Sequence, residues 1–157
     1  MTKLKKYFPA GFWVVGFQLV SAFIGMTTAR NMGWYQTLEK SELTPPEIAF
    51  PIVWTSLYIL LAVAAWMVWG EFKQRGINKA FILFWIQMLL NWAWSFVFFE
   101  FQMIELGFYW ICALNLTMVA YISVQWRTNK NAALLVAPTV LWASFAAYLN
   151  YSIMVMN

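Results

Sequence analysis

Long apolar stretches recur along the chain and are separated by short polar segments. Each stretch is long enough to form a helix of about 20 residues, which crosses about 30 Å of hydrocarbon at 1.5 Å per residue. The predicted helices cover residues 7–29, 48–69, 79–100, 105–126 and 132–155. This pattern predicts an all-α fold, an integral membrane bundle of five transmembrane helices.

Most of the connections between these stretches are short and polar, so consecutive helices must lie antiparallel and adjacent. The connection over residues 30–47 is longer and contains aromatic residues and a proline pair. A loop of that length in a compact protein commonly forms a functional lid. We therefore expect residues 1–157 to form a single five-helix transmembrane domain, with the first loop ordered as the lid of a pocket.

The composition agrees with a membrane location. Hydrophobic residues make up 63% and charged residues 10% of the chain, and the mean hydropathy is +0.65. Soluble domains have about 25% charged residues, so a bilayer is the expected solvent. Histidine is absent, which removes the usual zinc and haem ligand. We predict no metal site and no required cofactor. The single cysteine, Cys112, excludes an intrachain disulfide.

The basic residues are distributed unevenly across the predicted membrane. All but two of the ten lie on the side of the N-terminus: Lys3, Lys5, Lys6, Lys73, Arg75, Lys79, Arg127 and Lys130. Arg30 and Lys40 lie on the other side. The positive-inside rule then predicts a cytoplasmic N-terminus, with the first loop and the C-terminus outside. This distribution also explains the net charge of +4, so no nucleic-acid partner is expected.

Polar side chains deep in the predicted spans need partners inside the protein. Gln87, Asn91 and Ser95 recur at spacing four and share one helix face, while Asn115 and Asn150 lie in other spans. A hydrogen bond between helices explains any single amide. A stripe of three polar residues favours a cavity wall. The spans carry no central charge, which argues against an ion-driven pump.

Aromatic residues make up 20% of the chain, with 11 Trp, 7 Tyr and 14 Phe. Belts at the membrane interface account for tryptophans near span ends, but not for those deep inside: Trp54, Trp92, Trp94 and Trp142. Trp54 and Tyr58 share one helix face, and Trp142 shares another with Pro138 and Ala146. These rings are either core packing or a stacking site for a planar ligand.

Small residues recur at spacing four in the first span, at Ser21, Gly25 and Ala29. Such residues let helix backbones approach closely. We expect them to pack within the bundle, and a homodimer contact is the alternative.

Three blocks of sequence together cover nearly the whole chain. They are Trp34-Tyr35, Leu38, Lys40, Pro45-Pro46, Phe50-Pro51-Ile52-Val53-Trp54 and Leu57-Tyr58; then Gln87 through Ser95 with Phe98-Phe99; then Pro138, Trp142, Phe145-Ala146 and Leu149-Asn150-Tyr151. In order and spacing these blocks resemble the translocator protein family, also called tryptophan-rich sensory proteins or peripheral benzodiazepine receptors.

The resemblance implies a five-helix bundle, often dimeric, whose first loop closes over a pocket. Family members bind porphyrins and isoquinoline-carboxamide or benzodiazepine-type drugs, and animal members also bind cholesterol. Together with the helix faces described above, it gives these candidate ligand-binding residues: Trp34, Tyr35, Pro45, Pro46, Pro51, Trp54, Tyr58, Gln87, Asn91, Trp94, Ser95, Phe98, Trp142, Ala146 and Asn150.

Two departures from the family pattern change the expectations. Lys40-Ser41 replaces a Lys-Pro pair, which predicts a looser turn. No basic residue follows Tyr151, so specific cholesterol binding is not expected. The chain also lacks a polar tail after Asn157, which is more typical of a bacterial member.

The predicted function is that of a receptor-like or sensor-like membrane protein whose ligand is protoporphyrin IX or another planar hydrophobic molecule. One alternative is enzymatic, because some bacterial members are reported to degrade protoporphyrin under light. The resemblance would then make Trp54 and Trp142 the catalytic residues. A second alternative is passive transport of tetrapyrroles or other hydrophobic metabolites.

Overall fold

The computed structural model describes the backbone of residues 2–157 and the side chains of residues 10–157. Its elements are α1 (Thr2–Arg30), α2 (Met32–Thr37), α3 (Ala49–Arg75), α4 (Lys79–Ser95), the π-helix η1 (Phe96–Glu100), α5 (Ile104–Gln125) and α6 (Lys130–Met156). Five stretches are long and apolar enough to cross a membrane. They are α3, α5, α6, Ala10–Arg30 of α1, and α4 together with η1. The predicted all-α membrane bundle is therefore confirmed.

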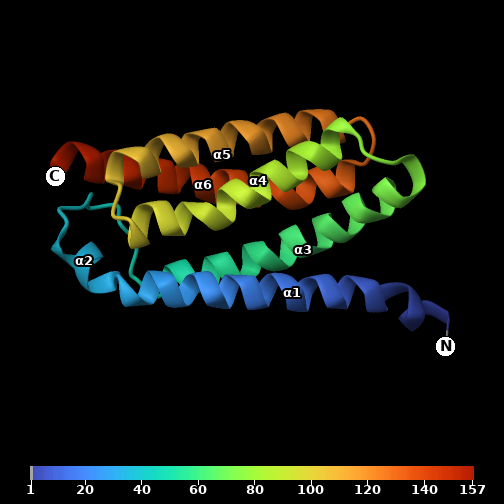
Figure 1. Ribbon diagram of the computed structural model, residues 1–157, viewed down its shortest axis with the longest axis horizontal. Coiled ribbons are helices and arrows are strands. Elements are labelled where there is room, and N and C mark those ends of the chain that lie inside the picture. Colours follow the sequence, from blue (N-terminus) through green and yellow to red (C-terminus); the bar gives the residue numbers. More distant parts are fainter. Residues whose placement is uncertain (1) are drawn as a thin grey trace.

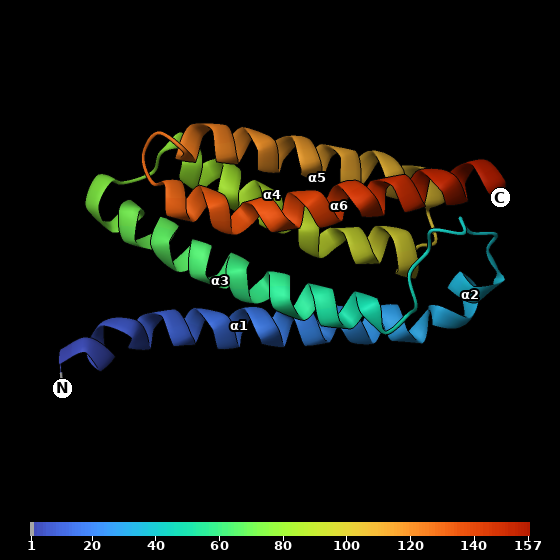
Figure 2. The same cartoon turned by 180° about the vertical axis from the view of Figure 1, so that it is seen from behind.

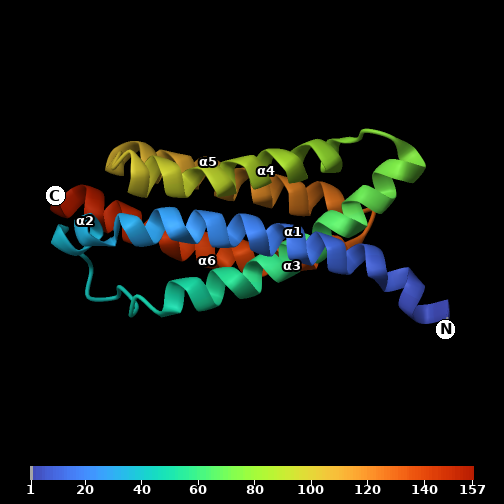
Figure 3. The ribbon, with the colours of Figure 1, turned by 60° about the horizontal axis from the view of Figure 1, so that its bottom comes forward.

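The long helices run side by side along one axis (Figure 1). Helix α5 packs against α4 and α6, and α1 packs against α3. Helix α3 also contacts α6 and so joins the two groups, as the view from behind shows (Figure 2). The short helix α2 and the loop that follows it lie at the same end as the C-terminus, opposite the N-terminus (Figure 3).

The polar breaks in the sequence form helix caps. Helix α3 continues past the predicted boundary at residue 69 to Arg75. It ends where Gly76 adopts a φ of 73° and its N–H donates to the carbonyl of Phe72 at 2.8 Å. This left-handed conformation favours glycine. The side chains of Asn78 and Asn129 accept backbone N–H bonds at the first turns of α4 and α6, as N-cap residues do.

The predicted helix over residues 79–100 changes character near its end. The last five residues, Phe96–Glu100, form the π-helix η1, which closes with the N–H of Phe101 donating to the carbonyl of Phe96 at 2.8 Å. The wider turn places Phe98 and Phe99 in the interior, where both are buried. Single π-helical turns often occur at functional sites.

The end of the bundle farthest from α2 is held by a carboxylate. Glu71 of α3 accepts hydrogen bonds from Gln125 Nε2 at 2.9 and 3.0 Å and from Asn129 Nδ2 at 2.9 Å. Gln125 is fully buried, so its amide depends on this carboxylate for an acceptor. The cluster fastens α3 to the turn between α5 and α6.

The predicted lid, residues 30–47, contains α2 and is fixed at several points. Lys40 Nζ donates to the backbone oxygens of Leu38 at 2.7 Å and Tyr35 at 2.9 Å. At the end of α6, Asn157 Oδ1 accepts from the N–H of Glu39 at 2.9 Å, and Asn157 Nδ2 donates to the Glu39 carbonyl at 3.0 Å. These bonds tie the loop to the last helix.

Ser41 occupies the position where the family pattern has proline. Its Oγ accepts from the N–H of Leu43 at 3.2 Å and lies 3.1 Å from the hydroxyl of Tyr148. Hydrogen bonds of the serine therefore support this turn, and the looser turn that the sequence indicated stays a prediction.

Candidate ligand-binding site

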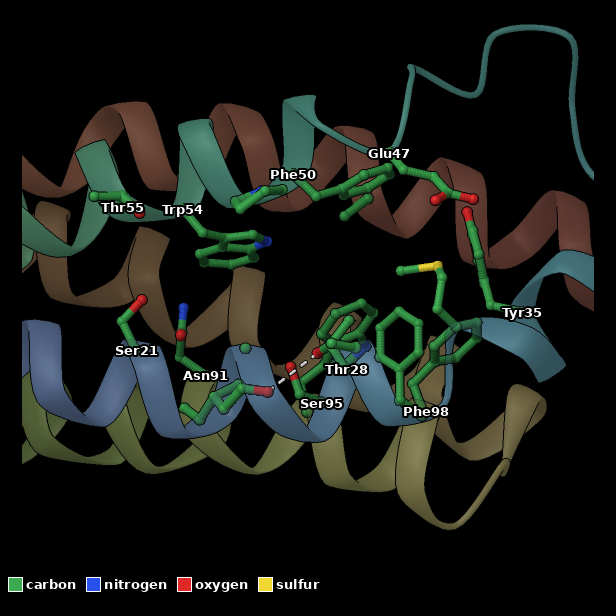
Figure 4. A pocket seen from close by; sticks show the side chains of 18 of the residues that line it. Ser21, Thr28, Tyr35, Glu47, Phe50, Trp54, Thr55, Asn91, Ser95 and Phe98 are labelled. Atoms are coloured by element: carbon green, nitrogen blue, oxygen red, sulfur yellow. Dashed lines mark hydrogen bonds between the residues drawn. The ribbon is translucent and has the colours of Figure 1, made fainter.

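A cavity of about 390 Å³ lies at the α2 end of the bundle. Ligand pockets usually measure about 300–1,000 Å³ and are mostly apolar, with a few oriented polar groups. The walls come from α1, α3, α4, η1 and α6, with α2 and the loop at one end (Figure 4). Helix α5 contributes no lining residue among those that the structure describes.

Most of the predicted site residues line this cavity. They are Tyr35, Pro51, Trp54, Tyr58, Asn91, Trp94, Ser95, Phe98, Ala146 and Asn150. Trp54 projects from α3 and lies across the cavity from Asn91 and Ser95 of α4 (Figure 4). The predicted helix faces thus meet around a single space.

Five of the predicted residues do not line the cavity. They are Trp142, which is described below, and Trp34, Pro45, Pro46 and Gln87. Trp34 packs edge-on against Phe98, with ring centroids 5.6 Å apart, and so contacts the wall from outside. Gln87 is fully buried one turn before Asn91, and neither atom of its amide has a hydrogen-bond partner among the described side chains. Pro45 and Pro46 lie in the loop. The Pro46 carbonyl accepts a hydrogen bond at 2.9 Å from the N–H of Ala49, the first residue of α3.

Trp142 also does not line the cavity. Its ring packs nearly perpendicular to Phe50, a lining residue, with centroids 5.9 Å apart. Its influence on a bound molecule would pass through Phe50. A direct role for Trp142 in binding stays a prediction.

Sequence reasoning did not assign the first helix to the site. The α1 residues that line the cavity are Gln18, Ser21, Ala22, Ile24, Gly25, Thr28 and Ala29. The repeat of Ser21, Gly25 and Ala29 was a visible signal, interpreted as close helix packing. Gly25 does not pack closely against another helix of this chain, because an added Cβ would meet no atom within 4 Å, and the homodimer contact stays a prediction. The small side chains leave space instead.

The other lining residues that were not among the candidate ligand-binding residues are Met32, Glu47, Phe50, Thr55, Phe99, Leu149 and Ile153. Most are apolar residues that resemble any lipid-facing position. Glu47 did carry a signal, as a charged residue directly after the proline pair and just before α3.

The inner end of the cavity has a fixed amide. The hydroxyl of Tyr58 donates to Asn91 Oδ1 at 2.6 Å, and both residues are 3% exposed. This bond occupies the acceptor and leaves Asn91 Nδ2 directed into the cavity (Figure 4). Among the described groups, neither Asn91 Nδ2 nor Asn150 Nδ2 has a partner. Buried donors without partners are costly, so Asn91 Nδ2, which is directed into the cavity, suits a ligand oxygen.

A flat aromatic wall lies beside these amides. The rings of Trp94 and Phe98 stack at 5.4 Å with an interplanar angle of 6°. Trp94 Nε1 donates to the carbonyl of Gly107 on α5 at 3.2 Å. A Cβ at Gly107 would lie 3.0 Å from Phe98 Cδ2 and 3.1 Å from Asn150 Nδ2. The close approach of α5 thus supports the wall from behind.

The opposite end of the cavity is polar as well. Figure 4 shows the hydroxyl of Tyr35 and the carboxylate of Glu47 directed toward one another, away from Asn91. Glu47 Oε1 also accepts a hydrogen bond from Gln36 Nε2 at 3.0 Å. Burial, and secondly the negative charge of Glu47, raise the pKa of the Tyr35 hydroxyl. Tyr35 therefore stays protonated at neutral pH and remains a donor.

In the part of the chain that the structure describes, five helices are long and apolar enough to cross a membrane, and four of them line one mostly apolar cavity. These features define a multi-pass membrane protein with an internal cavity. The comparisons with known proteins are more specific. The chain belongs to the TspO/MBR family, whose model matches residues 12–156. This confirms the family that the sequence blocks indicated.

Similar proteins come from bacteria and from animals. The chain is 38% identical to a tryptophan-rich protein TspO of Chlorobaculum tepidum, over 91% of this chain and 92% of that protein. It is 33% identical to the translocator protein of Ovis aries, over 88% of each chain. It is 30% identical to a tryptophan-rich sensory protein of Cereibacter sphaeroides, over 79% of this chain and 77% of the other.

Proposed function

We propose that this protein is a membrane receptor that binds a flat, hydrophobic ligand of the porphyrin type, such as protoporphyrin IX. The observation that carries the proposal is the form of the cavity. Trp54 forms one wall, the stacked pair Trp94 and Phe98 forms another, and the walls are otherwise mostly apolar. Aromatic stacking adds about 0.5–1.5 kcal/mol beyond the burial of area, which favours a planar molecule.

The polar groups extend the proposal to smaller ligands. Isoquinoline-carboxamide and benzodiazepine-type drugs carry carbonyl oxygens, which would accept from the unpartnered Nδ2 of Asn91. The names of two relatives, a sensory protein and a translocator protein, agree with a role in sensing or moving a ligand. From the distribution of basic residues, we place the α2 end of the cavity outside the cytoplasm.

A dark titration with protoporphyrin IX, followed by quenching of tryptophan fluorescence, tests binding. Quenching should saturate, and Trp54→Phe should weaken binding about two- to tenfold, because one stacking partner becomes smaller. Trp126→Phe is the matched control, since Trp126 is exposed and does not line the cavity. Non-saturating quenching, or equal affinity in the Trp54 variant, would contradict the proposal.

A second candidate function is light- and oxygen-dependent breakdown of the porphyrin. The favouring observation is that Trp54, an oxidisable ring, lies in the cavity wall. The illuminated porphyrin would supply the photochemistry, and the protein would supply orientation. Since Trp54 lines the cavity and Trp142 does not, Trp54→Phe should suppress a light-dependent product more than Trp142→Phe. Equal product from heat-denatured protein would indicate only photobleaching of free porphyrin.

A further inference from the structure

The electrostatic character of the cavity is set by one side chain. Of the described residues that line it, Glu47 alone is charged, and no lysine or arginine is among them. The remaining polar lining is neutral, made of hydroxyl and amide groups. A ligand inside therefore meets a single negative charge with no cation beside it in the wall.

The position of this charge is well defined. Glu47 is exposed in the loop before α3, and the bond from Gln36 Nε2 at 3.0 Å holds its carboxylate at the α2 end of the cavity. The lysine of the same loop, Lys40, keeps its positive charge but does not line the cavity. Lys40 Nζ donates to the backbone oxygens of Leu38, Tyr35 and Gln36 at 2.7, 2.9 and 3.4 Å.

The two ends of the cavity therefore differ in what they recognise. The inner end presents an N–H donor from Asn91, which is 3% exposed and whose Nδ2 has no protein partner in the described part of the chain. The outer end presents the carboxylate of Glu47 (Figure 4). An oxygen acceptor is favoured at the inner end, and an anionic group is repelled at the outer end.

We propose that Glu47 is a specificity-determining residue that selects against anionic ligands. The preferred ligand is a flat apolar molecule with hydrogen-bond acceptors at its inner end and a neutral or cationic group at its outer end. For a tetrapyrrole, an esterified form is preferred over the free dicarboxylate. This inference rests on the proposed function and specifies the ligand class of the same site.

The test compares two ligands with the same ring, protoporphyrin IX and its dimethyl ester, in uncharged detergent. Glu47→Gln removes the charge and keeps the acceptor for Gln36. It should tighten binding of the diacid about three- to tenfold, as expected for two like charges about 6 Å apart in a partly solvated site. The affinity for the diester should not change. Comparing variants with one ligand at a time cancels the different partitioning of the two ligands into detergent.

Two further variants sharpen the test. Glu42→Gln removes a charge from the same loop at an exposed residue that does not line the cavity, and it should leave both affinities unchanged. Glu47→Lys should increase the affinity for the diacid more than Glu47→Gln does. High salt should reduce both increases in affinity, because it screens exposed charges.

The outcomes distinguish a failure of charge selection by Glu47 from a failure of porphyrin binding itself. In one outcome, both ligands bind saturably while the Glu47 variants change the two affinities equally or change neither affinity. That result overturns the selectivity role of Glu47, and porphyrin binding stands. If neither ligand binds saturably to any variant, the proposed function fails and this inference fails with it.

Discussion

Replacing Tyr58 with phenylalanine removes one buried hydroxyl and keeps the ring in place. The hydroxyl lies 2.6 Å from Asn91 Oδ1, and both side chains are 3% exposed. Among the described groups, this hydroxyl is the one donor to Asn91 Oδ1, so no other side chain replaces it. The variant leaves the amide oxygen unsatisfied and frees the amide to rotate, so both the stability of the bundle and the orientation of Asn91 Nδ2 should suffer.

The expected magnitude follows from the burial of both partners. A buried polar group left without a partner costs about 1–3 kcal/mol, whereas hydrogen bonds between membrane helices contribute about 0.6–1.7 kcal/mol in double-mutant cycles. Tyr58→Phe and Asn91→Leu should each destabilise by about 1–3 kcal/mol, since each leaves one partner unsatisfied. The double variant removes both partners, so a coupling of about 1 kcal/mol is expected.

The cycle is measured by reversible unfolding in mixed micelles with increasing SDS, followed by circular dichroism. Tyr109→Phe is the control. Because Tyr109 is 57% exposed, this variant should unfold like the wild type. Strictly additive effects of the two single variants would refute the reasoning, since the hydroxyl and the amide would then act independently.

Four further variants test other parts of the account. In the same assay, Gly107→Ala should lower the free energy of unfolding by about 1–3 kcal/mol, because the added Cβ is too close to Phe98. Gly25→Ala, whose Cβ meets open space, should be neutral or more stable by about 0.5–1 kcal/mol. Glu71→Leu should lower the free energy of unfolding by about 1–3 kcal/mol, because the amide donors of Gln125 and Asn129 lose their acceptor. Porphyrin affinity should not change, because this cluster lies at the other end of the bundle. Asn157→Ala removes both bonds to the loop, so stopped-flow measurements should show faster ligand dissociation.

The spans could be predicted because lipid leaves the backbone little choice. Every N–H and C=O in hydrocarbon must be satisfied within the helix, so length and hydropathy alone indicate each one. The π-helix Phe96–Glu100 could not be predicted, because its residues are as apolar as those of the preceding α-helix. The end of α3 at Arg75 was missed because polarity marks the membrane surface and does not mark the end of a helix.

The site was predicted unevenly for a related reason. Helical spacing correctly grouped Trp54 with Tyr58 and Asn91 with Ser95, since each pair shares one helix face. Periodicity gives a helix face but not the distance to a cavity, so it could not show that Trp142 packs against Phe50 outside the lining. The α1 wall was missed because a cavity is formed partly by small side chains, which the sequence does not distinguish from close packing.

An experimental structure of the protein with bound protoporphyrin IX, in the dark, would test the central claim most directly. The account predicts the ring in the cavity at the α2 end, between Trp54 and the stacked rings of Trp94 and Phe98, with a ligand oxygen near Asn91 Nδ2. A porphyrin on the lipid-facing surface, with the cavity empty, would contradict it.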